Sequence, residues 1–303
     1  MTRKELVDIY NKSKLLGDDN VQIFETYKID DTKATPTKVK TGNLLVSVHD
    51  KELLLLVSDE VTKLTYEMIK HSLIFFASKI EKSFTMMQSN SIYQLKLFKV
   101  VGGKGVKSAD FGNIMVEVID LSDFDFSNIT SFDNMFKSVT AKRIIFNNPN
   151  TSNVKTMRNT FFSCHINDLD LSGFDTKSVT TMYQTFHSAR INRLNLSGWN
   201  TSSVENMSRM FSMCTTNELD LSSFTGESLQ DINEMFANAT VRDNIDISNL
   251  IVNCAASKER VFEHIQILDK EHITVGDSLI KLMVHKLKVE NTSTNYEQLK
   301  MYK

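Results

Sequence analysis

A repeat of 25 residues, which begins at residue 119 and continues to about residue 250, constrains the fold of this chain more than any other feature. The segment "LDLSGFDTKSVTTMYQTF" at 169–186 returns 25 residues later as "LNLSGWNTSSVENMSRMF" at 194–211. Successive units begin at an aliphatic residue, in order Ile119, Ile144, Leu169, Leu194, Leu219 and Ile245. Self-similarity at a fixed spacing of this size is typical of repeat proteins, so we expect the units to stack.

Each unit changes its hydrophobic period partway along. The opening L-x-L pattern alternates, as a short half-buried strand does. Later in the unit, the apolar residues after Val204 recur three, six and seven positions on, which places them on one face of a helix. The polar run "NTSS" before Val204 is typical of a helix start. The pattern predicts an α/β solenoid with short parallel strands on one side and helices on the other.

A single unit is too small to fold alone. Burying its apolar side chains stabilises it by about 10–20 kcal/mol. Fixing the backbone of a segment of this length costs about 25–50 kcal/mol in conformational entropy. Each unit must therefore bury its apolar face against its neighbours, which gives a continuous core along the array.

The only tryptophan of the chain follows the same repeat. Trp199 occupies the position that three other units fill with Phe124, Phe174 and Phe224. We therefore expect a core residue rather than a ligand-stacking residue. Two cysteines fall where other units carry valine or alanine, and we expect both to be small buried residues; they are Cys164 and Cys214.

The wording of the units, "LDLSGFDTKSVTTM" and "LNLSGWNTSSVENMSRMF", resembles that of the BspA-like leucine-rich repeat family. The resemblance covers about 119–250. It implies a leucine-rich-repeat solenoid that serves as a recognition scaffold and not as an enzyme. Members are best known as bacterial surface proteins for adhesion and binding, and related arrays occur in amoebae, large viruses and phages.

The remaining sequence is expected to cap the two ends of the array. Residues 1–113 are predicted to form an N-terminal α+β domain, with helices at 3–16 and 60–83, strands at 21–28 and 92–101, and a hairpin of "NLLVSV" and "ELLLLV". The repeats occupy 114–250. Residues 251–290 are predicted to form a C-terminal helical cap, with helices at 257–268 and 277–287 around a strand at 272–275. The tail, 291–303, is expected to be flexible.

Composition narrows the class of partner. The formal net charge is −2, so an overall attraction to nucleic acid or to anionic membranes is not expected. No apolar run is long enough to span a bilayer, so membrane insertion is not expected. The N-terminus lacks the apolar core of a secretory signal, which favours a cytoplasmic or virion-associated location. The family resemblance favours the cell surface instead.

Motifs for catalysis or cofactor binding are weak. "VGDSLIKL" at 275–282 matches a hydrolase nucleophile block, but no Asp-x-x-His follows Ser278 to supply a base. "GGKGVKS" at 102–108 lacks the spacing of a phosphate-binding loop. The histidines show no metal-binding spacing, and three cysteines without CxxC spacing indicate neither zinc nor a disulfide framework. We expect no catalytic residue, no metal site and no cofactor.

Two surfaces are candidates for partner binding. On the strand side, the outward position of L-x-L carries a polar residue in five of the six units, and the candidates are the last four of them, namely Asp170, Asn195, Asp220 and Asp246. On the helix side, basic and aromatic residues gather in the middle units, namely Lys155, Arg158, Phe162, Tyr183, His187, Arg190, Arg193 and Arg209. Arginine and tyrosine are enriched at the energetic centres of interfaces. The sequence does not decide between the two faces.

The functional expectation is a non-enzymatic interaction module of a phage, viral or bacterial protein that binds a macromolecular partner through the repeat surface. A protein partner is expected and nucleic acid is not; the oligomeric state stays open. One alternative is an enzyme with an unrecognised site in 1–113, whose repeats select the target. Another is a cell-surface adhesin whose secretion signal lies outside this sequence.

Overall fold

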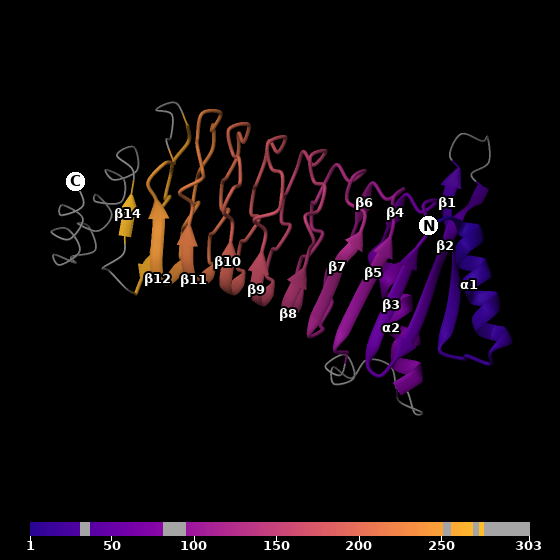
Figure 1. Cartoon of the computed structure of the whole chain (residues 1–303). Coiled ribbons are helices and arrows are strands. Elements are labelled where there is room, and N and C mark those ends of the chain that lie inside the picture. The colour runs from indigo at the N-terminus through magenta and orange to yellow at the C-terminus, as the bar shows by residue number, and fades with distance from the viewer. Residues whose placement is uncertain (31–36, 81–94, 251–255, 269–272, 276–303) are drawn as a thin grey trace.

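The computed structural model describes residues 1–30, 37–80, 95–250, 256–268 and 273–275. These residues form an elongated solenoid, with helix α1 at one end and strand β14 at the other (Figure 1). In each coil the chain rises through one strand and returns through a series of turns. We call the two sides the strand wall and the turn wall.

The strand wall is a parallel sheet in which neighbouring strands are also consecutive in the sequence. Its repeat strands are β7 (Val118–Phe124), β8 (Thr140–Ile145), β9 (His165–Asp170), β10 (Arg190–Asn195), β11 (Thr215–Asp220) and β12 (Thr240–Ile247). Two shorter strands, β13 (Gln266–Ile267) and β14 (Ile273–Val275), both pair with β12. The prediction of a solenoid with short parallel strands is confirmed.

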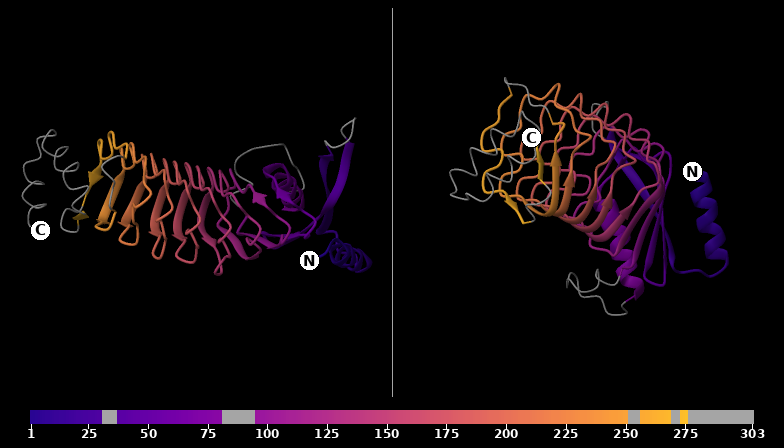
Figure 2. Two further views of the ribbon diagram at one scale, coloured as in Figure 1. Left: turned by 90° about the horizontal axis from the view of Figure 1, so that it is seen from above. Right: turned by 60° about the vertical axis from the view of Figure 1, so that its left-hand side comes forward.

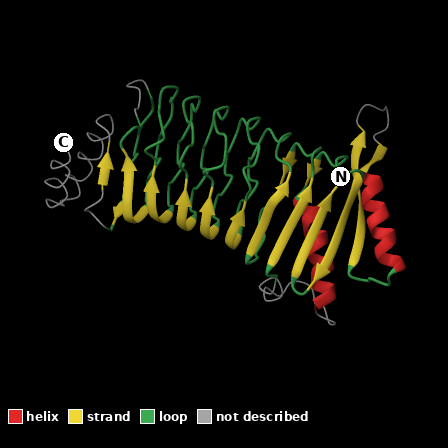
Figure 3. Ribbon diagram, viewed as in Figure 1, coloured by secondary structure: helices red, strands yellow, loops and turns green. Residues whose placement is uncertain are grey.

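The helices predicted for the repeats do not form. Between 114 and 250 every segment that leaves the strand wall is a chain of turns, and among the described residues Figure 3 colours helix only near the N-terminus. The backbone N–H of Met210 donates to the carbonyl of Met207 at 3.1 Å, three residues back rather than four. Two residues in each coil adopt the left-handed conformation, as Arg209 (φ 55°) and Met213 (φ 58°) do. Left-handed residues interrupt a right-handed helix.

The spacing between coils explains why turns replace helices. The six phenylalanines that close successive units stack ring on ring, with centroids 5.1–5.7 Å apart; they are Phe136, Phe161, Phe186, Phe211, Phe236 and Phe262. We call this column the phenylalanine ladder. A helix with its side chains is about 10 Å wide, twice the room that such a coil spacing leaves. The turns instead bond to the next coil, so that the N–H of Phe211 donates to Met235 O at 2.8 Å.

The residues that the repeat predicts to be in the core are buried. Trp199 is only 1% exposed, and its Nε1 donates to the carbonyl of Leu171 at 2.9 Å. Its ring stacks on that of Phe224, with the centroids 6.0 Å apart. Cys164 and Cys214 are buried free thiols, and burial raises the pKa of Cys214 to about 12. The predicted core roles of these three residues are confirmed.

The N-terminal segment extends the same sheet. The order β1-β2-β3-β5-β7 joins its strands to the repeats, with β1 (Val21–Asp30), β2 (Thr37–His49), β3 (Glu52–Val57) and β5 (Leu97–Gly102). A separate parallel pair consists of β4 (Lys63–Leu64) and β6 (Ser108–Ala109). The predicted first helix, first strand and hairpin are confirmed, and α1 is Arg3–Leu15. The second helix, α2, begins at Tyr66 rather than at 60 and is described as far as Ile80, and the expected strand at 92–101 is observed from Leu97; residues 81–94 lie outside the described part.

The two helices cover opposite faces of this sheet (Figure 2). Side chains alternate along a strand, so Leu44 and Leu45 of β2 point to opposite faces. Leu44 belongs to the main core, where Phe76 of α2 also packs. Leu45 belongs to a small second cluster with Leu6 of α1. Helix α2 therefore closes the N-terminal end of the solenoid core, and α1 covers the outer face.

The described part of the C-terminal region differs from the predicted helical cap. Residues 257–268 form a further coil and not a helix: Ser257 pairs with Asp231, and Phe262 stacks on Phe236 at 5.4 Å. The reason is the same as in the repeats, because this segment continues the ladder at the coil spacing. The strand predicted at 272–275 is observed as β14. The second predicted helix, 277–287, and the tail, 291–303, lie outside the described residues.

Candidate functional site

The polar residues predicted on the strand side are part of the turns that end each strand. A side-chain oxygen of each accepts the backbone N–H two residues on, at 2.9–3.1 Å; the four are Asp170, Asn195, Asp220 and Asp246. Such a bond stabilises a turn at the end of a strand. Asn195 makes it as well as the aspartates do, so the turn requires the oxygen and not the charge. The negative charges at these positions are therefore free for another role.

Two hollows lie side by side on the strand wall. The first, about 320 Å³, is lined by residues of β8, β9 and the turns after them, including Arg143, Ile145, Pro149 and Asp170. The second, about 380 Å³, is lined by residues of β10, β11 and β12, including Asn195, Glu218, Asp220 and Asp243. Asp168 borders both hollows, and its carboxylate accepts a hydrogen bond from Arg193 Nη2 at 2.8 Å. We call the two together the strand-face groove.

The first hollow lies where the sequence of one repeat unit differs from that of the others. The unit that begins at Ile144 reads "IIFNNPN" where the next unit reads "LDLSGFD". Ile145 replaces the aspartate, so the turn after β8 lacks that side-chain bond, and Asn148 takes the left-handed conformation with φ 41°. Ile145 and Pro149 are only half-buried there. The groove consequently has an apolar end, which no other unit repeats.

Carboxylates dominate the charge of the groove. Its lining contains five, namely Asp168, Asp170, Glu218, Asp220 and Asp243, against two arginines, Arg143 and Arg193. One of the arginines is already paired with Asp168. Unpaired like charges on neighbouring strands raise the local negative potential and attract cationic groups. The groove therefore favours a positively charged occupant.

The turn wall carries most of the predicted helix-side residues. Phe162 and His187 are stacked with their ring centroids 5.1 Å apart, and Lys137 Nζ lies 5.2 Å from the centroid of Phe162. Tyr183 lies one coil beyond Arg158 at the same repeat position. Arg158 is exposed and Tyr183 is half-buried. The remaining predicted residues on this wall are Lys155 and Arg209.

Two of the predicted helix-side residues lie on the other wall. Arg190 and Arg193 belong to β10, and Arg193 lines the strand-face groove. The prediction placed them after a repeat helix. Because no helix forms, the turns end by Ala189 and the next residue already begins the strand. Their assignment to the helix side was therefore wrong.

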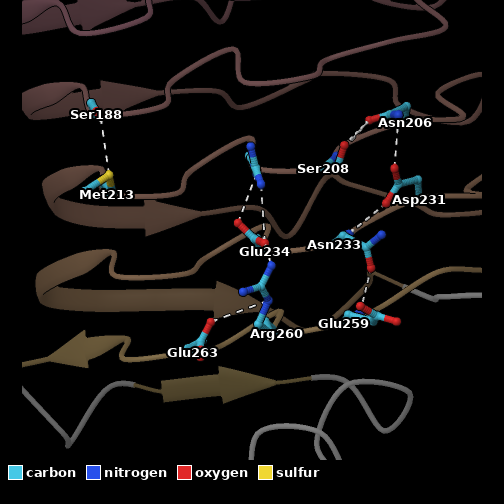
Figure 4. A network of polar contacts seen from close by, with 11 residues as sticks. Ser188, Asn206, Ser208, Met213, Asp231, Asn233, Glu234, Glu259, Arg260 and Glu263 are labelled. Carbon is cyan, nitrogen blue, oxygen red and sulfur yellow. Dashed lines mark hydrogen bonds and ion pairs between the residues drawn. The ribbon is translucent and has the colours of Figure 1, made fainter.

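The C-terminal half of the turn wall is cross-linked by polar contacts between coils (Figure 4). Arg209 Nε lies 2.9 Å from the carboxylate of Glu234, which also contacts Arg260 of the following coil. Arg260 lies 3.7 Å from Glu263. Ion pairs at such an exposed surface stabilise by only about 0–1 kcal/mol each, so their main effect is to order these side chains.

His187 is the residue on the turn wall whose ionisation is most constrained. Its Nδ1 is buried and has no hydrogen-bond partner among the described residues. Burial lowers the pKa of the imidazole below its ordinary value, and the nearby charge of Arg209 lowers it further. We therefore expect His187 to be neutral at pH 7.

An NMR titration checks this expectation. The imidazole signal that disappears in His187→Gln should titrate below the ordinary pKa of about 6.5. His187 binds a proton more readily in the unfolded state than in the folded state. Its protonation should therefore lower the free energy of unfolding as the pH falls through about 6.5. The wild-type protein should then lose more stability than His187→Gln between about pH 7 and pH 5. A pKa at or above the ordinary value would contradict the burial of the ring.

The prediction did not include six of the lining residues used in this argument: Arg143, Ile145, Pro149, Asp168, Glu218 and Asp243. One signal was present, because Ile145 interrupts an otherwise polar position. The others depend on the pairing of strands. Arg143, Asp168 and Arg193 are aligned across β8, β9 and β10.

Within the described part of the chain, no group of three or more histidine, cysteine, aspartate or glutamate residues has the geometry to hold a metal ion. In the same residues, neither helix has the length and apolar character that crossing a bilayer requires.

Comparison with known proteins identifies a family. A family model described as "Mycoplasma protein of unknown function, DUF285" matches three overlapping ranges, 108–195, 130–250 and 165–274. No curated protein and no solved structure matches the chain. The matched ranges cover the whole strand wall from β7 to β13 and part of β14. Together these ranges span 108–274, which is more than half of the chain. The chain therefore belongs to this family, DUF285, which is described as a family of Mycoplasma proteins of unknown function.

Proposed function

We propose that this protein is a non-enzymatic interaction module that binds an extended, positively charged segment of a protein partner in the strand-face groove. One observation carries the proposal: two adjoining hollows with an excess of carboxylates cross the strand wall from Arg143 to Asp243. Solenoids use such continuous walls as binding surfaces. The turns at Asp170, Asn195 and Asp220 need a side-chain oxygen but not its charge.

The two hollows favour different parts of the same partner segment. Glu218, Asp220 and Asp243 favour lysine or arginine side chains in the second hollow. Ile145 and Pro149 favour an apolar side chain in the first. A segment that reaches both must be extended, because the hollows lie on successive strands. Arg193, paired with Asp168 between them, separates the two contacts.

The wording of the repeats supports a relation to the BspA-like leucine-rich repeat proteins, which we include in the proposal. That relation is based on the sequence "LDLSGFDTKSV" and on its recurrence, and it agrees with a role in recognition. The acidic groove argues for a protein partner over nucleic acid, since phosphates are repelled by an excess of carboxylates.

Selection from a library of random displayed peptides tests the proposal. We expect the enriched peptides to carry lysine or arginine and to bind the purified protein with an affinity that falls as salt is raised. The double variant Glu218→Gln/Asp220→Asn should weaken the binding about 10-fold, measured by fluorescence anisotropy. Asn195 shows that asparagine preserves the turn, so this variant removes charge without altering the fold.

A matched variant on the opposite wall provides the control. Glu205→Gln/Glu259→Gln also removes two carboxylates, but from the turn wall, and should leave the affinity unchanged. Enriched peptides without basic residues, or equal binding by the groove variant and the wild type, would contradict the proposal.

A further inference from the structure

The turn wall carries opposite charge at its two ends. Its first three coils, 130–138, 155–163 and 180–188, contain the cations Lys137, Lys155 and Arg158 and one carboxylate, Asp133. Its last three coils, 205–213, 230–238 and 256–264, contain five carboxylates and three cations; the carboxylates are Glu205, Asp231, Glu234, Glu259 and Glu263. The wall is therefore positive toward the N-terminal end and negative toward the C-terminal end.

The two ends also differ in how many of their charged side chains form ion pairs within the chain. In the negative half, Arg209 and Arg260 both contact Glu234, so two of its cations are already engaged (Figure 4). In the positive half, Lys155 and Arg158 are exposed and have no ion pair among the described residues. The positive half thus presents cationic groups that a second molecule can reach.

One column of residues along the turn wall has opposite charges at its two ends, so it is complementary in charge to a second copy of itself that runs in the opposite direction. It consists of the residues that follow each phenylalanine of the ladder, namely Lys137, Phe162, His187, Ser212, Ala237 and Glu263. A two-fold axis that lies in the wall, across the solenoid, places each column opposite itself and reverses the order of the coils. Lys137 then faces Glu263 of a second copy, whose carboxylate lies 3.7 Å from Arg260 of its own chain and remains partly exposed. Ser212 and Ala237 are buried, so between the charged ends this column presents chiefly the half-buried rings of Phe162 and His187.

We propose that two copies of this chain associate through their turn walls in antiparallel orientation. The alternative parallel orientation would bring the positive ends of the two walls together, and it is disfavoured by repulsion. The aromatic residues Phe162, Tyr183 and His187 lie toward the middle of the wall, where they supply apolar area between the charged ends. Charge sets the direction, and the aromatic residues supply much of the buried surface.

The association goes beyond the proposed peptide binding and does not depend on it. The strand-face groove lies on the opposite wall and stays open in the pair. Each pair then presents two grooves facing outward, which increases the apparent affinity for a partner that carries two binding segments.

Sedimentation analysis of the purified full chain tests the inference. At about 50 µM protein and about 50 mM salt, we expect the mass of a dimer, and dissociation as salt is raised. Lys137→Glu and Glu263→Lys each reverse two contacts per dimer and should each weaken association at least about 10-fold. The double variant Lys137→Glu/Glu263→Lys restores opposite charges across the interface and should return the dissociation constant to within about 3-fold of wild type.

Two controls separate this result from general effects of charge or folding. Arg143→Glu reverses a charge on the strand wall and should leave association unchanged. Circular dichroism should show that each variant keeps the wild-type fold. A monomeric wild-type protein under these conditions, full association of Lys137→Glu, or a double variant no tighter than the single ones would each overturn the inference. None of these outcomes bears on peptide binding, which is measured separately on the opposite wall.

Discussion

Replacement of Trp199 by alanine should lower the free energy of unfolding by about 3–5 kcal/mol, which is the range for removing a large buried aromatic side chain. The indole is 1% exposed, stacks on Phe224 and lies 6.2 Å from the ring of Phe186. Its removal leaves a cavity between neighbouring coils that close-packed neighbours refill only in part. Urea unfolding followed by far-ultraviolet circular dichroism measures the change without requiring tryptophan fluorescence.

The matched variant Trp199→Phe should cost much less, about 1 kcal/mol. Phenylalanine fills the equivalent position in two neighbouring units, at Phe174 and Phe224. The variant loses the bond from the indole to Leu171 O, but that carbonyl also accepts the N–H of Phe174 at 3.1 Å and so keeps a partner. Equal losses in the two variants would show that the hydrogen bond, and not the volume, stabilises the site.

Replacement of Gly105 by alanine should destabilise the protein by about 2–3 kcal/mol, through steric conflict in a closely packed turn. A Cβ atom at this position would lie 1.9 Å from the backbone carbonyl oxygen of Asp59. Backbone atoms cannot move aside as a flexible side chain does, so the two segments must separate. Gly105 in this turn is therefore packed against the backbone of 59–61.

Gly173→Ala provides the comparison. The nearest atom to an added Cβ there is Asn148 Oδ1 at 3.4 Å, which is close to ordinary contact. We expect a change within about 0.5 kcal/mol, as is usual for surface positions. Thermal unfolding of both variants in the same buffer measures the difference. A Gly105→Ala protein as stable as Gly173→Ala would mean that the contact with Asp59 is absent in solution.

The candidate site could be predicted only in part. The strand-side aspartates were identified from their place in the repeat, and three of the four predicted residues line the groove: Asp170, Asn195 and Asp220. Their bonds to the following backbone N–H groups were not foreseen, because a turn is defined by its backbone and not by its composition. The two arginines of β10 were placed on the wrong wall because a helix was assumed where turns occur.

The periodicity of the sequence by itself determined which residues face inward, that the units stack, and that Trp199 and the phenylalanine ladder form the core. These properties depend only on a pattern that recurs every 25 residues. The tertiary structure alone decided what connects the strands. A spacing near three suits both a helix and a chain of turns, and the choice follows from coils too close together to admit helices. It also decided which charges meet, since Arg193 pairs with Asp168, a residue one whole unit away.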